Sequence, residues 1–170
     1  MSSSYLQATE SDLSQRDIFE LAEQKAIALG YQPGREIEPI IESLGGNIIL
    51  VSMRRWLETQ DGSICVHGPK KFDIFLSNFN SPLRNRFTLA HELGHYFLHS
   101  EEGKKLIYAA RRGSTKTEWQ ANWFAAAFLM PKEEFLNTLS KFNEDLDFVA
   151  AHFLVSRKAA DVRYTSLFKS

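Results

Sequence analysis

The spacing of apolar residues predicts helices over most of the chain. In these segments apolar side chains recur three and four residues apart, which places them on one face of a helix. Caps and breakers set several ends: Ser11 or Asp12 can cap the first helix, Gly30 ends it, and Pro131 ends a later one. The predicted helices are 14–29, 37–44, 83–99, 117–130, 133–139, 146–154 and 156–167.

Three shorter segments predict strands. Asn47–Ser52 is a β-branched, apolar run of the kind found in buried strands. Ser63–His67 and Phe72–Ser77 flank the turn sequence Gly-Pro-Lys-Lys, which predicts a hairpin. The second strand of the hairpin is expected at a sheet edge, because the polar segment 78–82 leads directly from it into the next helix.

These elements predict an α+β fold in which a small three-stranded sheet packs on a mainly helical core. Residues 1–10 are polar and serine-rich and predict a disordered lead, and the polar, basic segment 100–115 predicts a loop. Residues 11–170 are then expected to form a single domain, with 144–170 as a helical C-terminal subregion. A hydrophobic content of 44% in 170 residues supplies enough apolar area for one compact core.

Charge and cysteine content exclude several classes of partner and location. The formal net charge is −1, so no overall field attracts nucleic acid or acidic membranes. Cys65 is the one cysteine, which excludes an intramolecular disulfide and fits a reducing compartment. The chain has no run of 18 apolar residues and no signal-like start, which favours the cytoplasm and argues against a membrane partner.

The segment 87–99 contains the motif His-Glu-x-x-His, at His91, Glu92 and His95. On a helix the two histidines lie about 40° apart around the axis and about 6 Å apart along it, so both imidazoles can reach one tetrahedral metal ion. Zinc held by three protein ligands lowers the pKa of a bound water to about 7, and Glu92 is placed to accept its proton. The motif is short and also occurs by chance on helices that bind nothing. The apolar setting favours the metal, because burying two histidines and a glutamate without a shared partner is costly.

A catalytic zinc site needs a third protein ligand. Glu101 lies six residues after His95, where the pattern His-Glu-x-x-His-x-x-Gly-x-x-His has its third ligand, but Leu98 stands where that pattern needs glycine for a sharp turn. Glu118 opens an apolar helix, and this helix packed beside the two histidines would give a His2Glu site. Asn122, one turn later on the same face, is expected to hydrogen-bond a ligating histidine. The alternative for Glu118 is an ordinary first-turn carboxylate that the helix dipole favours.

The two halves of this site carry a resemblance to a known family. Arg86–His95, followed by Glu-x-x-Ala-Asn-x-Phe-Ala-Ala-x-x-Leu-Met-Pro over 118–131, resembles the ImmA/IrrE family of metallopeptidases. The tail over 153–163 is similar to that family's C-terminal segment, and the likeness extends over about Ser63–Leu167. The two-part motif is far more specific than His-Glu-x-x-His alone.

The resemblance implies a gluzincin-like fold, a Zn²⁺ ion held by His91, His95 and Glu118, and Glu92 as general base. It also implies regulated proteolysis: members of this family relieve repression by cleaving helix-turn-helix repressors, and some occur in toxin–antitoxin-like gene pairs. The expected partner is therefore a separate helix-turn-helix repressor or antitoxin-like protein. Direct nucleic-acid binding by the chain's own tail is not expected, because acidic residues offset its basic ones.

Two neighbours of the motif are not expected to bind the metal. His99 lies two turns from His91, about 12 Å along the axis, and is expected to be a helix-end residue favoured by the dipole. Gln120 stands where many members of the family carry a glutamate, a departure that leaves the zinc ligands unchanged.

In this class of peptidase an extended substrate is expected to bind at a sheet edge, main chain to main chain. The predicted edge strand would then supply the substrate-binding residues, and the alternative is a plain edge strand with no such role. For the whole protein, the alternative function is a metal-stabilised module that docks a repressor or nucleic acid without proteolysis. The substrate-binding residues expected are Phe72, Asp73, Ile74, Phe75 and Leu76.

Overall fold

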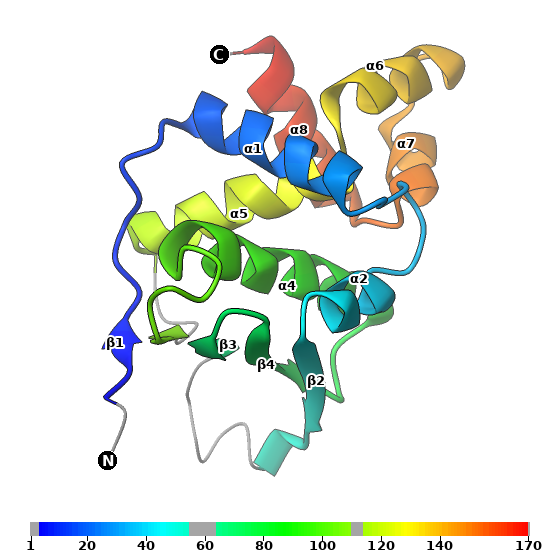
Figure 1. The fold of residues 1–170 in the computed structure, drawn as a ribbon. Coiled ribbons are helices and arrows are strands. Elements are labelled where there is room, and N and C mark those ends of the chain that lie inside the picture. Colours follow the sequence, from blue (N-terminus) through cyan, green and yellow to red (C-terminus); the bar gives the residue numbers. More distant parts are fainter. Residues whose placement is uncertain (1–3, 55–63, 110–113, 170) are drawn as a thin grey trace.

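A computed structural model describes residues 4–54, 64–109 and 114–169 of the chain. They form an α+β fold in which the long helices are stacked on a five-stranded mixed sheet (Figure 1). The strands, in their order across the sheet, are β1 (Leu6–Gln7), β5 (Ile107–Ala109), β3 (Ile64–Gly68), β4 (Lys71–Ser77) and β2 (Gly46–Val51). The pairs β1–β5 and β2–β4 are parallel, whereas β3 is antiparallel to both of its neighbours.

The prediction of a three-stranded sheet is therefore wrong in the number of strands. The two strands that were missed, β1 and β5, are two and three residues long, too short for an alternating pattern to identify them. β1 lies inside the predicted disordered lead, where the Leu6 amide donates to the Leu106 carbonyl at 2.9 Å. Leu6 and Gln7 of the predicted lead are therefore paired with Ile107 and Tyr108 of β5. Ser63, the predicted start of β3, lies outside the described residues.

β4 lies inside the sheet, so its prediction as an edge strand is wrong. It pairs with β2 over Phe72–Ser77 and with β3 over Lys71–Ile74. An alternating pattern is the same for an internal strand and an edge strand, and it does not reveal that the earlier strand β2 lies alongside. The backbone of Phe72, Asp73 and Ile74 is paired on both sides, and that of Phe75 and Leu76 is paired with β2. A substrate strand cannot be added where both sides are already paired.

All seven predicted helices are present, with ends that agree to within two residues. They are α1 (Gln15–Ala28), α2 (Glu38–Ser43), α4 (Pro82–Gly94, continued by a π-helical turn, His95–His99), α5 (Lys116–Leu129), α6 (Lys132–Lys141), α7 (Leu146–Phe153) and α8 (Arg157–Phe168). α4 lies between the sheet and α5, and α1 and α8 lie on the far side of α5 (Figure 1). None of the helices within the described ranges is long and apolar enough to cross a membrane.

α5 is the central helix, which explains why its sequence from Ala121 onward is almost entirely apolar. It contacts α4 on one side and α1 and α8 on the other, and Phe124 and Phe128 are fully buried. α4 can approach it closely because Gly94 has no side chain at the crossing. A Cβ atom at Gly94 would lie 3.0 Å from the Ala121 Cα atom and 3.1 Å from the Ala121 carbonyl oxygen. This close approach brings the histidines of α4 within reach of the first turn of α5.

Arg163 anchors the C-terminal helices to the rest of the core. Its side chain is fully buried, donates from Nε to the Met130 carbonyl at 2.9 Å, and pairs with Glu23 of α1 at 2.6 Å. The guanidinium also lies over the Phe19 ring, 4.9 Å from its centroid. One arginine thus connects α8 with α1 and with the end of α5.

Candidate metal site

Three side chains from α4 and α5 converge on one point. The Nε2 atoms of His91 and His95 lie 3.2 Å apart, and each lies 3.2 Å from a carboxylate oxygen of Glu118. All three residues are buried. Ligands about 2.0–2.1 Å from a tetrahedral zinc ion are separated by about 3.3 Å, so the observed triangle has the size that such an ion requires.

The local sequence places each of these groups. Glu118 lies in the first turn of α5, where the Thr115 side chain caps the helix by accepting from the Glu118 amide. His91 and His95 lie one turn apart at the end of α4, where the helix widens into the π-helical turn. Such turns are rare and are frequently found at functional sites.

Asn122 orients the first histidine, as the sequence led us to expect. Its Oδ1 atom lies 2.8 Å from the Nδ1 atom of His91, so Nδ1 carries the proton and donates it. In a neutral imidazole the other nitrogen then has a free lone pair. The Nε2 atom of His91 therefore faces the centre of the site as an acceptor or a metal ligand.

A longer chain of hydrogen bonds fixes the second histidine in the same way. The Ser11 amide donates to Gln120 Oε1 at 2.9 Å, and Gln120 Nε2 donates to the Ser11 carbonyl at 2.7 Å, which sets the orientation of the amide. His99 Nε2, 3.1 Å from Gln120 Oε1, must then be a donor, so His99 Nδ1 is an acceptor. It accepts from His95 Nδ1 at 2.8 Å, which leaves the Nε2 lone pair of His95 facing the site.

With these tautomers, the three groups at the centre of the site bring lone pairs and no hydrogen. Two imidazole lone pairs and a carboxylate at 3.2 Å from one another repel, unless a cation lies between them. A divalent metal ion would supply that cation. The donor set of two imidazoles and one carboxylate is the one found in several catalytic zinc sites.

The electrostatic environment favours the metal-binding forms of His95 and Glu118 at neutral pH. Burial lowers the pKa of His95 to about 4, below its ordinary value of 6.5, so the imidazole is neutral. Burial alone would raise the pKa of Glu118, but the effect of the His91 and His95 side chains beside it is larger, and the pKa lies well below its ordinary value. Neutral imidazoles and an ionised carboxylate are the states that bind metal.

The other candidate residues are placed as follows. Glu92 is buried on α4 at the position after His91. Glu101, where the pattern His-Glu-x-x-His-x-x-Gly-x-x-His has its third ligand, is exposed and pairs with Lys105 at 2.5 Å. His99 ends the π-helical turn, as expected, but it is also buried against His95, and its hydrogen bonds with His95 and Gln120 were not predicted. The continuing four-residue spacing of the histidines was the one available signal for His99.

We expect Gln120→Leu to weaken zinc binding by about 10- to 100-fold, the usual effect of losing a group that orients a metal ligand. Leucine fills a similar volume but cannot accept from His99, so the proton positions on His99 and His95 are no longer fixed. Gln120→Glu keeps the acceptor oxygen and is the matched control, with an affinity expected to remain within a few-fold of the unaltered protein. Competition with a chelating dye measures both, and equal affinities for the leucine variant and the unaltered protein would contradict this role.

Comparison with known proteins agrees with a metal site of the peptidase type. The family profile described as IrrE N-terminal-like domain (Peptidase_M78) matches residues 57–165. The metallopeptidase ImmA of Bacillus subtilis (strain 168) is 30% identical over 103 residues, which are 58% of this chain and 60% of that protein. The chain thus matches less than two thirds of this relative's length. A solved structure titled Mycobacterium tuberculosis transcriptional regulator has a similar fold, with a TM-score of 0.61 at 18% identity, covering 88% of this chain and 47% of that chain.

Proposed function

The chain belongs to the Peptidase_M78 family of IrrE N-terminal-like domains, and from this premise we propose that it is a zinc-dependent endopeptidase that cleaves a specific protein partner. The observation that carries the proposal is the 3.2 Å triangle of His91, His95 and Glu118. With the tautomers fixed by Asn122 and by His99, this triangle presents three lone-pair donors to one point. Such an arrangement suits a metal ion and is unfavourable without one.

The proposed roles divide between holding the ion and moving a proton. His91, His95 and Glu118 would hold zinc, which supplies a Lewis acid and an activated water when it is bound. Glu92 would act as general base, accepting the proton of the attacking water, and would then pass this proton to the leaving amine of the cleaved peptide bond. Asn122 and His99 would hold the two imidazoles in the ligating orientation during these steps.

The proposed substrate is a separate helix-turn-helix repressor or an antitoxin-like protein. This part of the proposal is supported by the resemblance to the ImmA/IrrE family, whose members act on such repressors. The relative with 30% identity is itself named a metallopeptidase.

The test is cleavage of a purified candidate partner, chosen among helix-turn-helix regulators of the same organism, starting with any that is encoded beside this gene. Zinc-loaded protein is expected to cut it into a few discrete fragments, and removal of the metal with a chelator is expected to stop the reaction. Re-addition of zinc should restore the same fragments, identified by mass spectrometry. A fragment pattern that is unaffected by chelation would refute the proposed metal dependence.

A further inference from the structure

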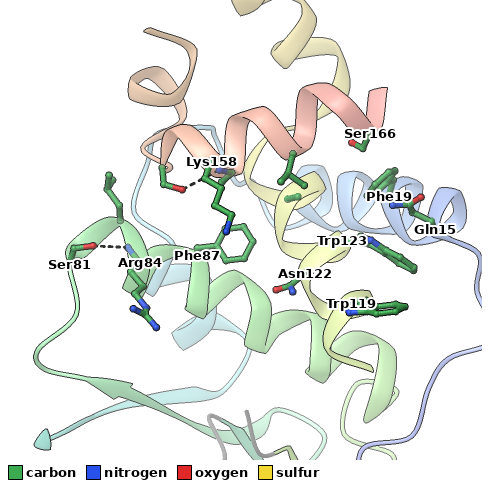
Figure 2. Close-up of a pocket in the computed structure, with 15 residues that line it drawn as sticks. Gln15, Phe19, Ser81, Arg84, Phe87, Trp119, Asn122, Trp123, Lys158 and Ser166 are labelled. Atoms are coloured by element: carbon green, nitrogen blue, oxygen red, sulfur yellow. Dashed lines mark hydrogen bonds between the residues drawn. The ribbon is translucent and has the colours of Figure 1, made fainter. Parts of the chain in front are cut away.

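A cavity lies between α1, α4, α5 and α8, apart from the metal site (Figure 2). Its volume is about 600 Å³, within the range of about 300–1,000 Å³ that is usual for small-molecule sites. Most of its wall is aromatic or aliphatic, and parts of that wall, such as Trp119 and Val162, are exposed to solvent. The larger apolar lining residues are Phe19, Leu83, Phe87, Trp119, Trp123 and Val162.

One cation reaches into this apolar space. Figure 2 shows the Lys158 side chain extending from α8 toward Phe87, whereas the guanidinium of Arg84 points away from the centre. No carboxylate is among the described residues that line the cavity, and across the described ranges Lys158 has no ion-pair partner. The neighbouring Arg157, in contrast, pairs with both Asp147 and Asp161. Lys158 is therefore a cation above a concave aromatic surface, with no paired carboxylate in the part of the chain that the structure describes.

We propose that this cavity binds a small amphipathic anion, with an apolar acyl or aromatic body and one carboxylate or phosphate group. The apolar body would lie against the two tryptophans and Phe87, since removal of such surface from water is favourable. The anionic group would pair with Lys158 at the rim, where it remains partly hydrated and avoids the penalty for full burial. A cationic ligand with the same body lacks this pairing and is repelled.

The cavity is separate from the metal site, although the two share one residue. Asn122 lines the cavity and also accepts from His91 Nδ1, on the side of the ring that faces away from the metal ligands. None of His91, His95 and Glu118 is among the lining residues. The proposal therefore does not depend on proteolysis and can be tested on the metal-free protein.

The test uses decanoate and decyltrimethylammonium, which have the same alkyl chain and opposite charge. Nuclear magnetic resonance of the ¹⁵N-labelled protein follows the indole N–H signals of Trp119 and Trp123, which line the cavity. Decanoate is expected to shift both signals in a saturable way, below the concentration at which it forms micelles. Decyltrimethylammonium is expected to bind at least several-fold more weakly.

Two charge-reversal variants on α8 test whether Lys158 is the cation that binds the anionic group. Lys158→Glu should weaken decanoate binding by about three- to tenfold, because an attractive contact becomes repulsive. Lys169→Glu makes the same charge change at the end of α8, outside the cavity, and should leave the affinity unchanged. Both positions are exposed, so neither change is expected to disturb folding.

Three results would overturn the proposal. The first is equal binding of the anion and the cation, and the second is a Lys158→Glu variant with unaltered affinity for decanoate. The third is the absence of saturable shifts with decanoate while an acidic, apolar peptide does produce them. That last result would assign the cavity to a protein partner instead.

Discussion

Glu92→Gln is expected to abolish cleavage of the protein partner while leaving metal binding intact. Glutamine has nearly the shape of glutamate but cannot accept a proton, and general-base catalysis contributes about 10²- to 10⁴-fold to a rate. Glu92 is buried beside His91 and is not one of the three groups whose ligand atoms converge. We therefore expect kcat/KM to fall by about 10³-fold or more. The zinc content of each chain, measured by atomic absorption, should equal that of the unaltered protein.

The same variant separates hydrolysis from simple docking. A metal-stabilised module that works by binding its partner keeps its shape in Glu92→Gln and would retain its function. Glu101→Gln is the matched control, because it makes the same chemical change at an exposed residue nearby that pairs only with Lys105 among the described residues. Cleavage at the normal rate by a fully zinc-loaded Glu92→Gln protein would rule out the proposed mechanism.

The helices could be predicted from the sequence because the signals that define a helix, apolar spacing and capping residues, lie within the helix itself or next to it. α1 shows this well: Ile18, Ala22 and Ala26 are buried at four-residue intervals, and Ser14 and Asp17 form the capping box. The sheet could not be predicted to the same degree, because strand order depends on which distant segments pair. β4 has the alternating pattern of a half-buried strand, yet it is covered on both edges.

The metal site likewise has a part that follows from local sequence and a part that depends on long-range contacts. His91 and His95 are recognisable because their spacing follows directly from helix geometry, and Glu118 because it opens an apolar helix. The link from His99 through Gln120 to Ser11 was not predictable, because it depends on the π-helical turn and on contact between segments more than 100 residues apart. Sequence patterns identify ligands on one helix more readily than the groups that orient those ligands.

Glu118→Gln is expected to weaken zinc binding by about 10³-fold, more than the loss of an orienting group, which costs about 10- to 100-fold. Glutamine keeps the volume but replaces an ionised ligand with a neutral amide, so two imidazoles and no charge remain to hold the ion. Isothermal titration in the presence of a competing chelator measures the change. Zinc should also raise the melting temperature of the unaltered protein and have little effect on the variant, because stabilisation by a ligand follows its affinity.

Glu133→Gln is the control that distinguishes a metal ligand from a helix-capping charge. Glu133 is likewise a carboxylate in the first turn of a helix, α6, but it is exposed and outside the metal site. If Glu118 acted only through the helix dipole, both variants would lose about 0.3–1 kcal/mol of stability and neither would change zinc affinity. A Glu118→Gln protein that binds zinc as tightly as the Glu133→Gln control would therefore show that the third ligand lies elsewhere. The expected gap between the two variants exists because the Glu118 carboxylate lies 3.2 Å from both imidazole nitrogens, a distance that a shared cation makes favourable.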